Sequence, residues 1–414
     1  MEQTKFSFTR KTITIASLSA ILITSLILAI VSFAIRRLPD DKNDNSDMST
    51  IMNNSVETSK NHIENSSIEN VNENANVSDV FAESTLSSDN SVENSTNESN
   101  VDEEISHGWI INEYGYTYVY NGCGFEQFNF KTSALERYIN SFDNLVNVLP
   151  EQTRIFNITV PVSSTFASIP REIYTNDNFY NQSQSAFVST VASKNNKKII
   201  DIPIVSLLQE HYDNDEYLFF KTDKNWTSLA AYYAYRAFCE NAEFDSYSIE
   251  NYVKRDMGDY LGSFYHATKL SSMYESPDSL VCYSTLPTVK TSLTVYDGEL
   301  VYSDYALCNN KVSLYSGYNV FLGRSAARYE INTTSKGGSV LIIGDTSAHP
   351  IVPFLATHYS KIDIIDPRKF DKPLNEFLSE REYDDCITMC YSTNAISGEY
   401  IPAFNNFIGD NNNE

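Results

Sequence analysis

The chain has 414 residues, enough for two or three domains of ordinary size. It carries 54 acidic and 30 basic side chains, for a formal net charge of −24. Because this charge repels phosphate backbones and no basic stripe offsets it, we expect no nucleic-acid partner. Aromatic residues make up 13% of the chain, which favours a β or α/β domain over a coiled coil or a disordered protein.

The first distinctive segment, from Ile13 to Ile35, contains 23 residues and no charge. About 20 apolar residues span a bilayer, so we expect a transmembrane anchor here. A cleaved signal peptide is the alternative, but its apolar stretch is shorter and ends at small residues, whereas this one ends before Arg36 and Arg37. The excess of basic residues before the span places residues 1–12 in the cytoplasm and the remainder outside the cell membrane.

Residues 36–105 have the composition of a tether. From residue 41 to residue 105 there are 14 Asn, 13 Ser, fifteen acids and only two bases. So little apolar surface cannot offset the entropy of an ordered chain, and we expect a solvated, self-repelling linker.

Residues 106–414 have the pattern of an α/β domain. We predict strands at residues 154–162, 198–202, 339–343, 361–365 and 385–391. We predict a helix at residues 227–240 with Thr227 as its N-cap, and a second helix after residue 346 with Pro350 in its first turn. Such strand–helix–strand units indicate a mostly parallel sheet with helices on both faces.

The six cysteines do not indicate a metal site. Cys386 and Cys390 are four residues apart on a predicted strand, which separates them by roughly 13 Å, too far to bind one ion. Buried thiols or one structural disulfide are the expected alternatives, and we expect neither a metal nor a cofactor.

Two polar segments stand out as candidate sites. One runs from Phe219 to Thr227, between a strand and the predicted helix, and the other runs from Leu341 to Pro350 as a strand, a turn and a helix start. In open α/β sheets the carboxyl end of a strand is where ligands bind, and a helix start there offers N–H groups that can stabilise an oxyanion.

Together the two segments resemble the signatures of a family. TDKNWTSLAAYYAY (residues 222–235) resembles the Thr-Asp-His-His-Trp-Thr-Ser-Leu-Gly-Ala-Tyr-Tyr segment of the DHHW family. LIIGDTSAHPIVPFLATHYSKIDIIDPRKF (residues 341–370) resembles its second signature, and residues 320–331 are similar to the segment that precedes it.

That family is similar to the SGNH-hydrolase-like proteins of alginate O-acetylation, the AlgX/AlgJ type. The resemblance implies a flavodoxin-like three-layer α/β sandwich, circularly permuted so that the Asp-x-His block precedes the serine block. It also implies a Ser-His-Asp triad and acetyl transfer to or from a cell-surface polysaccharide. A membrane-bound O-acyltransferase is the second partner that the resemblance implies.

The triad departs from the family pattern at its centre. Asp223 matches the acid and Trp226 the motif tryptophan, but Asn225 stands at the histidine position and Thr346 at the serine position. A hydroxyl needs a base to take its proton, and an amide is not one. We therefore expect a catalytically degenerate member that binds glycan or a partner.

The alternative is an active acetyl-ester hydrolase or O-acetyltransferase that uses Thr346 as its nucleophile. His349 is three residues further on and could replace the missing base if both share one helix face. Asp223 is the other candidate for the base. Ser347 could act as the nucleophile if the turn were shifted by one residue. A purely structural surface protein is the third possibility.

For other residues of the two segments, a structural role and a functional role are both open. Trp226 could stack on a sugar ring or pack in the core. With Asp345 and Ser347 it forms the expected substrate-binding set. Asp366 and Arg368 are expected to form a local ion pair.

Overall fold

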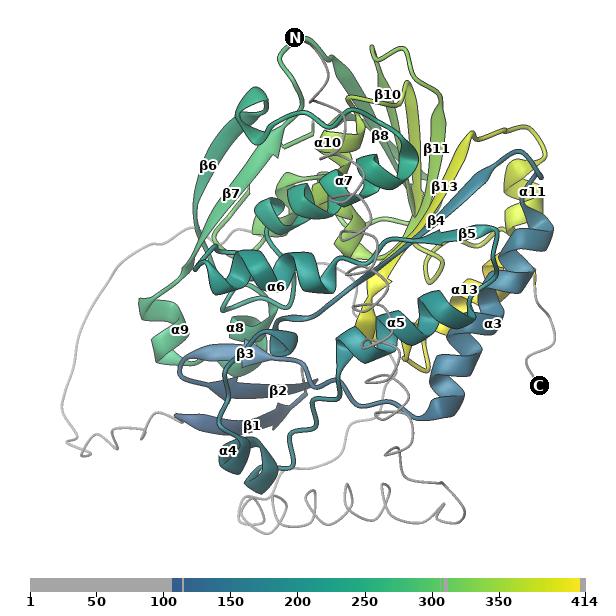
Figure 1. Ribbon diagram of the computed structural model, residues 1–414. Coiled ribbons are helices and arrows are strands. Elements are labelled where there is room, and N and C mark those ends of the chain that lie inside the picture. The colour runs from purple at the N-terminus through teal and green to yellow at the C-terminus, as the bar shows by residue number, and fades with distance from the viewer. Residues whose placement is uncertain (1–105, 114, 306, 309–311, 410–414) are drawn as a thin grey trace, which may run out of the picture. The chain divides into compact units, whose positions relative to one another are not determined.

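The computed structural model describes residues 106–113, 115–305, 307, 308 and 312–409 (Figure 1). The predicted transmembrane span and tether lie outside these residues. Within the described part of the chain, no helix has the length and apolar character needed to cross a membrane.

The main sheet has eight strands and is mixed. Its strands are β4 (Arg154–Val160), β5 (Ile199–Asp201), β8 (Thr291–Asp297), β9 (Leu300–Tyr305), β10 (Arg328–Thr333), β11 (Ser339–Gly344), β12 (Lys361–Ile365) and β13 (Asp385–Tyr391). Their spatial order is β5-β4-β13-β11-β12-β10-β8-β9. The neighbouring pairs β5–β4, β4–β13, β13–β11 and β11–β12 are parallel. The pairs β12–β10, β10–β8 and β8–β9 are antiparallel. The expected α/β fold with a mostly parallel sheet is thus confirmed, with an antiparallel extension that the sequence patterns did not predict.

Helices cover both faces of the sheet (Figure 1). One face packs against α7 (Ser228–Ala242) and α10 (Val352–Leu355). The other packs against α3 (Thr132–Val148), α5 (Gln184–Lys194), α11 (Leu374–Leu378) and α13 (Tyr400–Ile408). The alternation of β11 explains how one strand serves both layers, since Val340 and Ile342 join the first core and Leu341 and Ile343 the second.

Smaller elements surround this sandwich. The short helices are α4 (Arg171–Asn176), α6 (Val205–Asp213), α8 (Ser263–Thr268), α9 (Ser271–Glu275) and α12 (Ser392–Ala395). The 3-10 helices are η1 (Ser163–Thr165), η2 (Ile249–Asn251), η3 (Gly317–Val320) and η4 (Thr346–Ile351). β6 (Val253–Tyr260) pairs with β7 (Asp278–Ser284), and β1 (His107–Asn112), β2 (Gly115–Tyr120) and β3 (Cys123–Phe125) form a three-stranded sheet.

Most predicted elements are confirmed, but one segment predicted as an α-helix begins as a 3-10 helix. The five predicted strands match β4, β5, β11, β12 and β13, and Thr227 caps α7 by accepting a hydrogen bond from the Ala230 amide. The helix predicted after residue 346 is instead η4 followed by the single turn of α10. Pro350 and Pro353 explain the difference, because neither has an N–H group with which to continue an α-helical ladder.

All six cysteines are free thiols, so of the two alternatives the structure has buried thiols, with Cys123 half-buried. Cys386 and Cys390 both point into the core on the α3 side. In the described residues, no group of three or more His, Cys, Asp or Glu side chains is placed to hold a metal ion.

Candidate functional site

The two polar segments meet at the carboxyl end of the parallel strands. The loop before α7 is closed by an antiparallel bridge between Phe219 and Trp226, which presents Asp223 and Asn225 at its tip. Thr346 opens η4 directly after β11. The expected juxtaposition of these segments is therefore present in the structure.

Three side chains form a chain of hydrogen bonds in which Asn225 is the middle member. The Thr346 hydroxyl donates to Asn225 Oδ1 at 3.2 Å, and Asn225 Nδ2 donates to Asp223 Oδ1 at 2.5 Å. This is the hydrogen-bond pattern of an acid–base–nucleophile relay with an amide in the place of the base. We call these three residues the relay.

Asp223 is buried in a cradle of donors. Its carboxylate accepts hydrogen bonds from the Asn225 amide N–H at 2.7 Å, the Tyr260 hydroxyl at 2.8 Å and the Ser263 amide N–H at 2.7 Å. A Cβ atom on Gly262 would lie 2.2 Å from this carboxylate, so only glycine lets the backbone approach so closely. Sequence reasoning missed Tyr260, Gly262 and Ser263.

The Asn225 amide is oriented by its neighbours. The Tyr391 hydroxyl donates to Asn225 Oδ1 at 3.1 Å and itself accepts the Trp226 amide N–H at 3.1 Å. With donors on the oxygen side and the acceptor-only carboxylate of Asp223 on the nitrogen side, the amide cannot be turned over without losing these bonds. Tyr391, at the end of β13, was also missed.

Both carboxylate oxygens of Asp345 accept hydrogen bonds from other groups of the protein. Its Oδ1 accepts from the Ser347 amide at 2.8 Å, and its Oδ2 accepts from the Tyr391 amide at 3.0 Å and from Asn394 Nδ2 at 2.5 Å. With 2% exposure and both oxygens occupied, Asp345 fixes the turn to the end of β13 and leaves no oxygen for a substrate.

Ser347 is fully buried, and its hydroxyl has no hydrogen-bond partner in the described residues. Thr346, in contrast, lines a cavity. The turn thus presents Thr346 and not Ser347, which removes the basis for Ser347 as a nucleophile or a substrate ligand.

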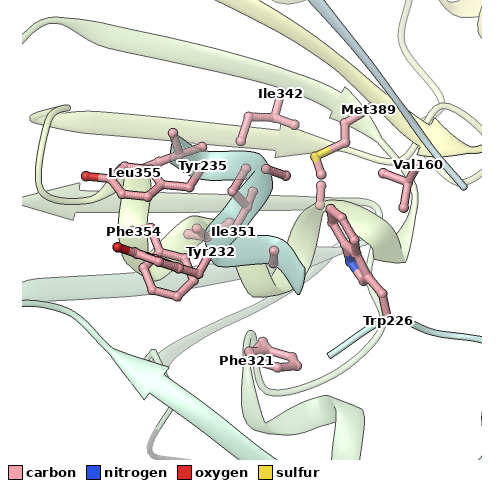
Figure 2. Close-up of a cluster of buried hydrophobic side chains, with 14 of the residues drawn as sticks. Val160, Trp226, Tyr232, Tyr235, Phe321, Ile342, Ile351, Phe354, Leu355 and Met389 are labelled. Atoms are coloured by element: carbon pink, nitrogen blue, oxygen red, sulfur yellow. The ribbon is translucent and has the colours of Figure 1, made fainter. Parts of the chain in front are cut away.

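Trp226 packs in the core. Its exposed fraction is 0%, and its ring lies beside Val160 and Met389 (Figure 2). Its indole N–H donates to the Ser347 carbonyl at 3.0 Å, which ties the relay loop to the turn. Of the two alternatives for this tryptophan, the structure shows core packing, because no face of the ring is open to a sugar.

His349 is not positioned as a base for Thr346 in this structure. Its ring lies against Tyr329 and Tyr318, and no hydrogen bond joins it to Thr346 in the part of the chain that the structure describes. Burial lowers the pKa of His349 to about 4, so the imidazole is neutral and a weak base at neutral pH.

The relay forms one wall of a cavity of about 350 Å³. Thr346, Asn225 and His349 line it, and Lys224 and Arg368 bring positive charge. Arg368 pairs with Asp366 through two hydrogen bonds of 3.0 and 2.8 Å, which confirms the predicted ion pair. This pairing raises the pKa of Arg368 and holds its guanidinium at the cavity wall.

In the described residues, the Thr346 hydroxyl donates its hydrogen bond to an amide oxygen and to no basic side chain. The amide oxygen of Asn225 accepts that hydrogen bond without taking the proton, because an amide is not basic at neutral pH. An unactivated hydroxyl is a weak nucleophile. In this structure Thr346 is therefore not activated by Asn225.

Comparisons with known proteins bear on this site. A DHHW family protein from Eubacterium siraeum has a similar structure, with a TM-score of 0.61 and 21% identity over 72% of this chain and 97% of that one. Bacillus cereus PatB1 follows with a TM-score of 0.54 and 17% identity, over 71% of this chain and 99% of that one. The O-acetyltransferase domain of Pseudomonas putida AlgJ has a TM-score of 0.39 and 11% identity, over 72% of this chain and 99% of that one.

At 21% and 17% identity, the similarity to the first two structures establishes a shared fold but no shared activity. No curated protein matches the sequence of this chain. The sequence profile of the DHHW protein family, however, matches residues 35–365, far more than half of the chain, and covers both halves of the relay. The chain therefore belongs to the DHHW protein family.

Proposed function

We propose that this DHHW protein binds an O-acetylated cell-surface polysaccharide in the relay cavity without turning it over efficiently. The observation that carries the proposal is the Asn225 amide between Asp223 and Thr346, which makes both hydrogen bonds of a triad base but cannot accept a proton. The resemblance to SGNH-hydrolase-like proteins suggests the acyl ester as the chemistry to which the cavity is adapted.

We also propose a topology for the domain and a location for the protein. Asp223 and Asn225 precede Thr346 in the chain, which fits a circularly permuted, flavodoxin-like SGNH arrangement. We infer that residues 13–35 anchor the protein in the cell membrane and that residues 36–105 hold the domain outside the cell. A membrane-bound O-acyltransferase would then be a neighbour in the same membrane.

A test is acetyl-ester hydrolysis by the full chain, with p-nitrophenyl acetate as the probe. We expect wild type and Thr346→Ala to give the same low rate. The double variant Asn225→His/Thr346→Ser places a base between Asp223 and a serine hydroxyl, and a positioned general base contributes about 10²–10⁴-fold. We therefore expect that variant to exceed wild type by at least about tenfold.

The single variant Thr346→Ser is the matched control, because it supplies the better hydroxyl without a base. It should remain near the wild-type rate. Wild-type turnover that Thr346→Ala abolishes would contradict the proposal and favour the second candidate, an acetyl-ester hydrolase or transferase with a threonine nucleophile. That candidate is supported by the position of Thr346 on the cavity wall, where its hydroxyl is hydrogen-bonded to Asn225.

A further inference from the structure

A row of three tyrosine rings lies at the rim of the relay cavity. The ring centroids of Tyr315 and Tyr265 are 6.2 Å apart, and those of Tyr265 and Tyr274 are 6.0 Å apart. The planes of the first pair differ by only 10° and those of the second by 32°. We call Tyr265, Tyr274 and Tyr315 the tyrosine row.

The row is held by the same backbone that holds the relay acid. Tyr265 lies on α8, whose first residue, Ser263, donates its amide N–H to Asp223. The amide of Tyr265 itself donates to the carbonyl of Thr222 at 3.1 Å. Backbone hydrogen bonds therefore fix Tyr265, the middle residue of the row, relative to the relay.

Tyr315 joins the row to the cavity. It lines the cavity together with His266, and the ring centroids of these two residues are 5.4 Å apart. Its carbonyl accepts a 3.4 Å hydrogen bond from His266, which follows Tyr265 on α8. The row thus begins at the cavity and continues outward over α8 and α9.

The row is open to solvent at both ends. Tyr274 is 56% exposed and Tyr315 is 47% exposed, and within the described residues none of the three hydroxyls has a hydrogen-bond partner. Large aromatic side chains gain free energy from burial, so neighbouring exposed rings beside a cavity mark a surface that a ligand covers.

The size of the cavity limits how much of a polysaccharide can lie inside it. Ligand cavities span about 300–1,000 Å³, and a cavity of about 350 Å³ lies at the small end of that range. A polysaccharide therefore cannot be contained in it, and the units next to the one inside must pass over the rim. The pyranose ring has an apolar face of C–H groups that suits an aromatic ring and an edge of hydroxyls that suits a phenol.

We propose that the tyrosine row is a saccharide-binding subsite that stacks against the pyranose units adjacent to the unit in the relay cavity. This inference rests on the proposed function and extends it to the recognition of a sugar chain. Lys269, whose Nζ lies 5.1 Å from the centre of the Tyr265 ring, can donate hydrogen bonds to hydroxyl or carboxylate groups of the same units.

The test is titration of the full chain with three hexasaccharides, made of β-1,4-linked glucose, N-acetylglucosamine and a uronic acid. We expect at least one to bind the wild type. Tyr315→Ala and Tyr274→Ala should each weaken that binding by about three- to tenfold, the loss expected for one aromatic contact. Tyr315→Phe and Tyr274→Phe, which retain the ring, should stay within about threefold of wild type.

Tyr180→Ala is the matched control, because Tyr180 is 53% exposed and has no ring contact with the row. It should bind as wild type does, and circular dichroism should show all variants folded. The inference is overturned if no hexasaccharide binds, if the two alanine variants bind as wild type does, or if Tyr180→Ala weakens binding equally.

The hexasaccharide titration and the acetyl-ester hydrolysis experiment test the two proposals independently. Loss of hexasaccharide binding on removal of the row, with no gain of hydrolysis in Asn225→His/Thr346→Ser, would retain the subsite and reject the acyl-ester cavity. A gain of hydrolysis in that double variant, with no effect of the row on hexasaccharide binding, would retain the cavity and reject the subsite.

Discussion

The Asn225 side chain makes two hydrogen bonds of the kind that a triad histidine makes. A neutral histidine would donate one hydrogen bond to Asp223 and accept one from the nucleophile, and the Asn225 amide makes both bonds. The two side chains differ in basicity, since only the imidazole can hold the transferred proton near neutral pH. The donors around Asp223 are present in the structure together with an amide at position 225.

Gly262 allows that cradle to form, and its replacement is expected to disrupt it. In Gly262→Ala the new Cβ would lie 2.2 Å from the Asp223 carboxylate, so that carboxylate or the backbone must move. Overpacking of this kind costs about 1–3 kcal/mol of unfolding free energy, measurable by urea denaturation. Gly398→Ala is the control, because nothing lies within 4 Å of the position that its methyl group would take, and equal stability of the two variants would contradict the argument.

At the scale of elements, the turn from β11 into η4 depends on Asp345. Asp345→Ala leaves the Ser347 amide, the Tyr391 amide and Asn394 Nδ2 without their acceptor. Loss of a cap and of hydrogen bonds to a charged group should lower the unfolding free energy by about 2–4 kcal/mol in chemical denaturation. The exposed Asp371 provides the comparison, since Asp371→Ala should change stability by no more than about 0.5 kcal/mol. Similar values for both variants would show that Asp345 does not hold the turn.

Local patterns predicted the elements that bury apolar side chains on both faces. Strands β11 and β13 are continuous apolar runs with turn residues at their ends, and α7 has a threonine cap ahead of an apolar stretch. β6 was missed because it is mostly exposed, whereas β7 and β8 alternate between buried and more exposed residues and could have been predicted from that alternation. An Asn-Gly signal at residues 121 and 122, where both φ angles are positive, could have identified the β2–β3 hairpin.

The site was predicted only where its residues share a motif. Asp223, Asn225 and Thr346 lie in the two family signatures, and the structure brings them together. Tyr260 contacts Asp223 from 37 residues away, and Tyr391 contacts Asn225 from 166 residues away. Such contacts depend on the topology of the sheet and leave no local pattern in the sequence.

The described part of the chain buries polar as well as apolar side chains, and His349 links that burial to pH. Its side chain is 8% exposed and its pKa is lowered to about 4 by loss of hydration, whereas the unfolded chain has the ordinary value near 6.5. Above about pH 6.5 the imidazole is neutral in both states and contributes no pH dependence. Below that pH the unfolded state binds the extra proton, so stability falls as the pH is lowered towards 4.

The expected loss from His349 alone is about 2 kcal/mol at pH 5 and about 3 kcal/mol at pH 4, relative to pH 7. Carboxylates also titrate in this range, so the quantity to measure is the unfolding free energy of wild type minus that of His349→Gln at each pH. The substitution itself sets the size of this difference at pH 7. Relative to that value, the difference should shrink by about 2 kcal/mol at pH 5 and about 3 kcal/mol at pH 4, because glutamine does not titrate. A difference that stays constant from pH 7 to pH 4 would mean that His349 is protonated equally in the folded and unfolded chains, and its buried position against Tyr329 would then not be that of a neutral imidazole.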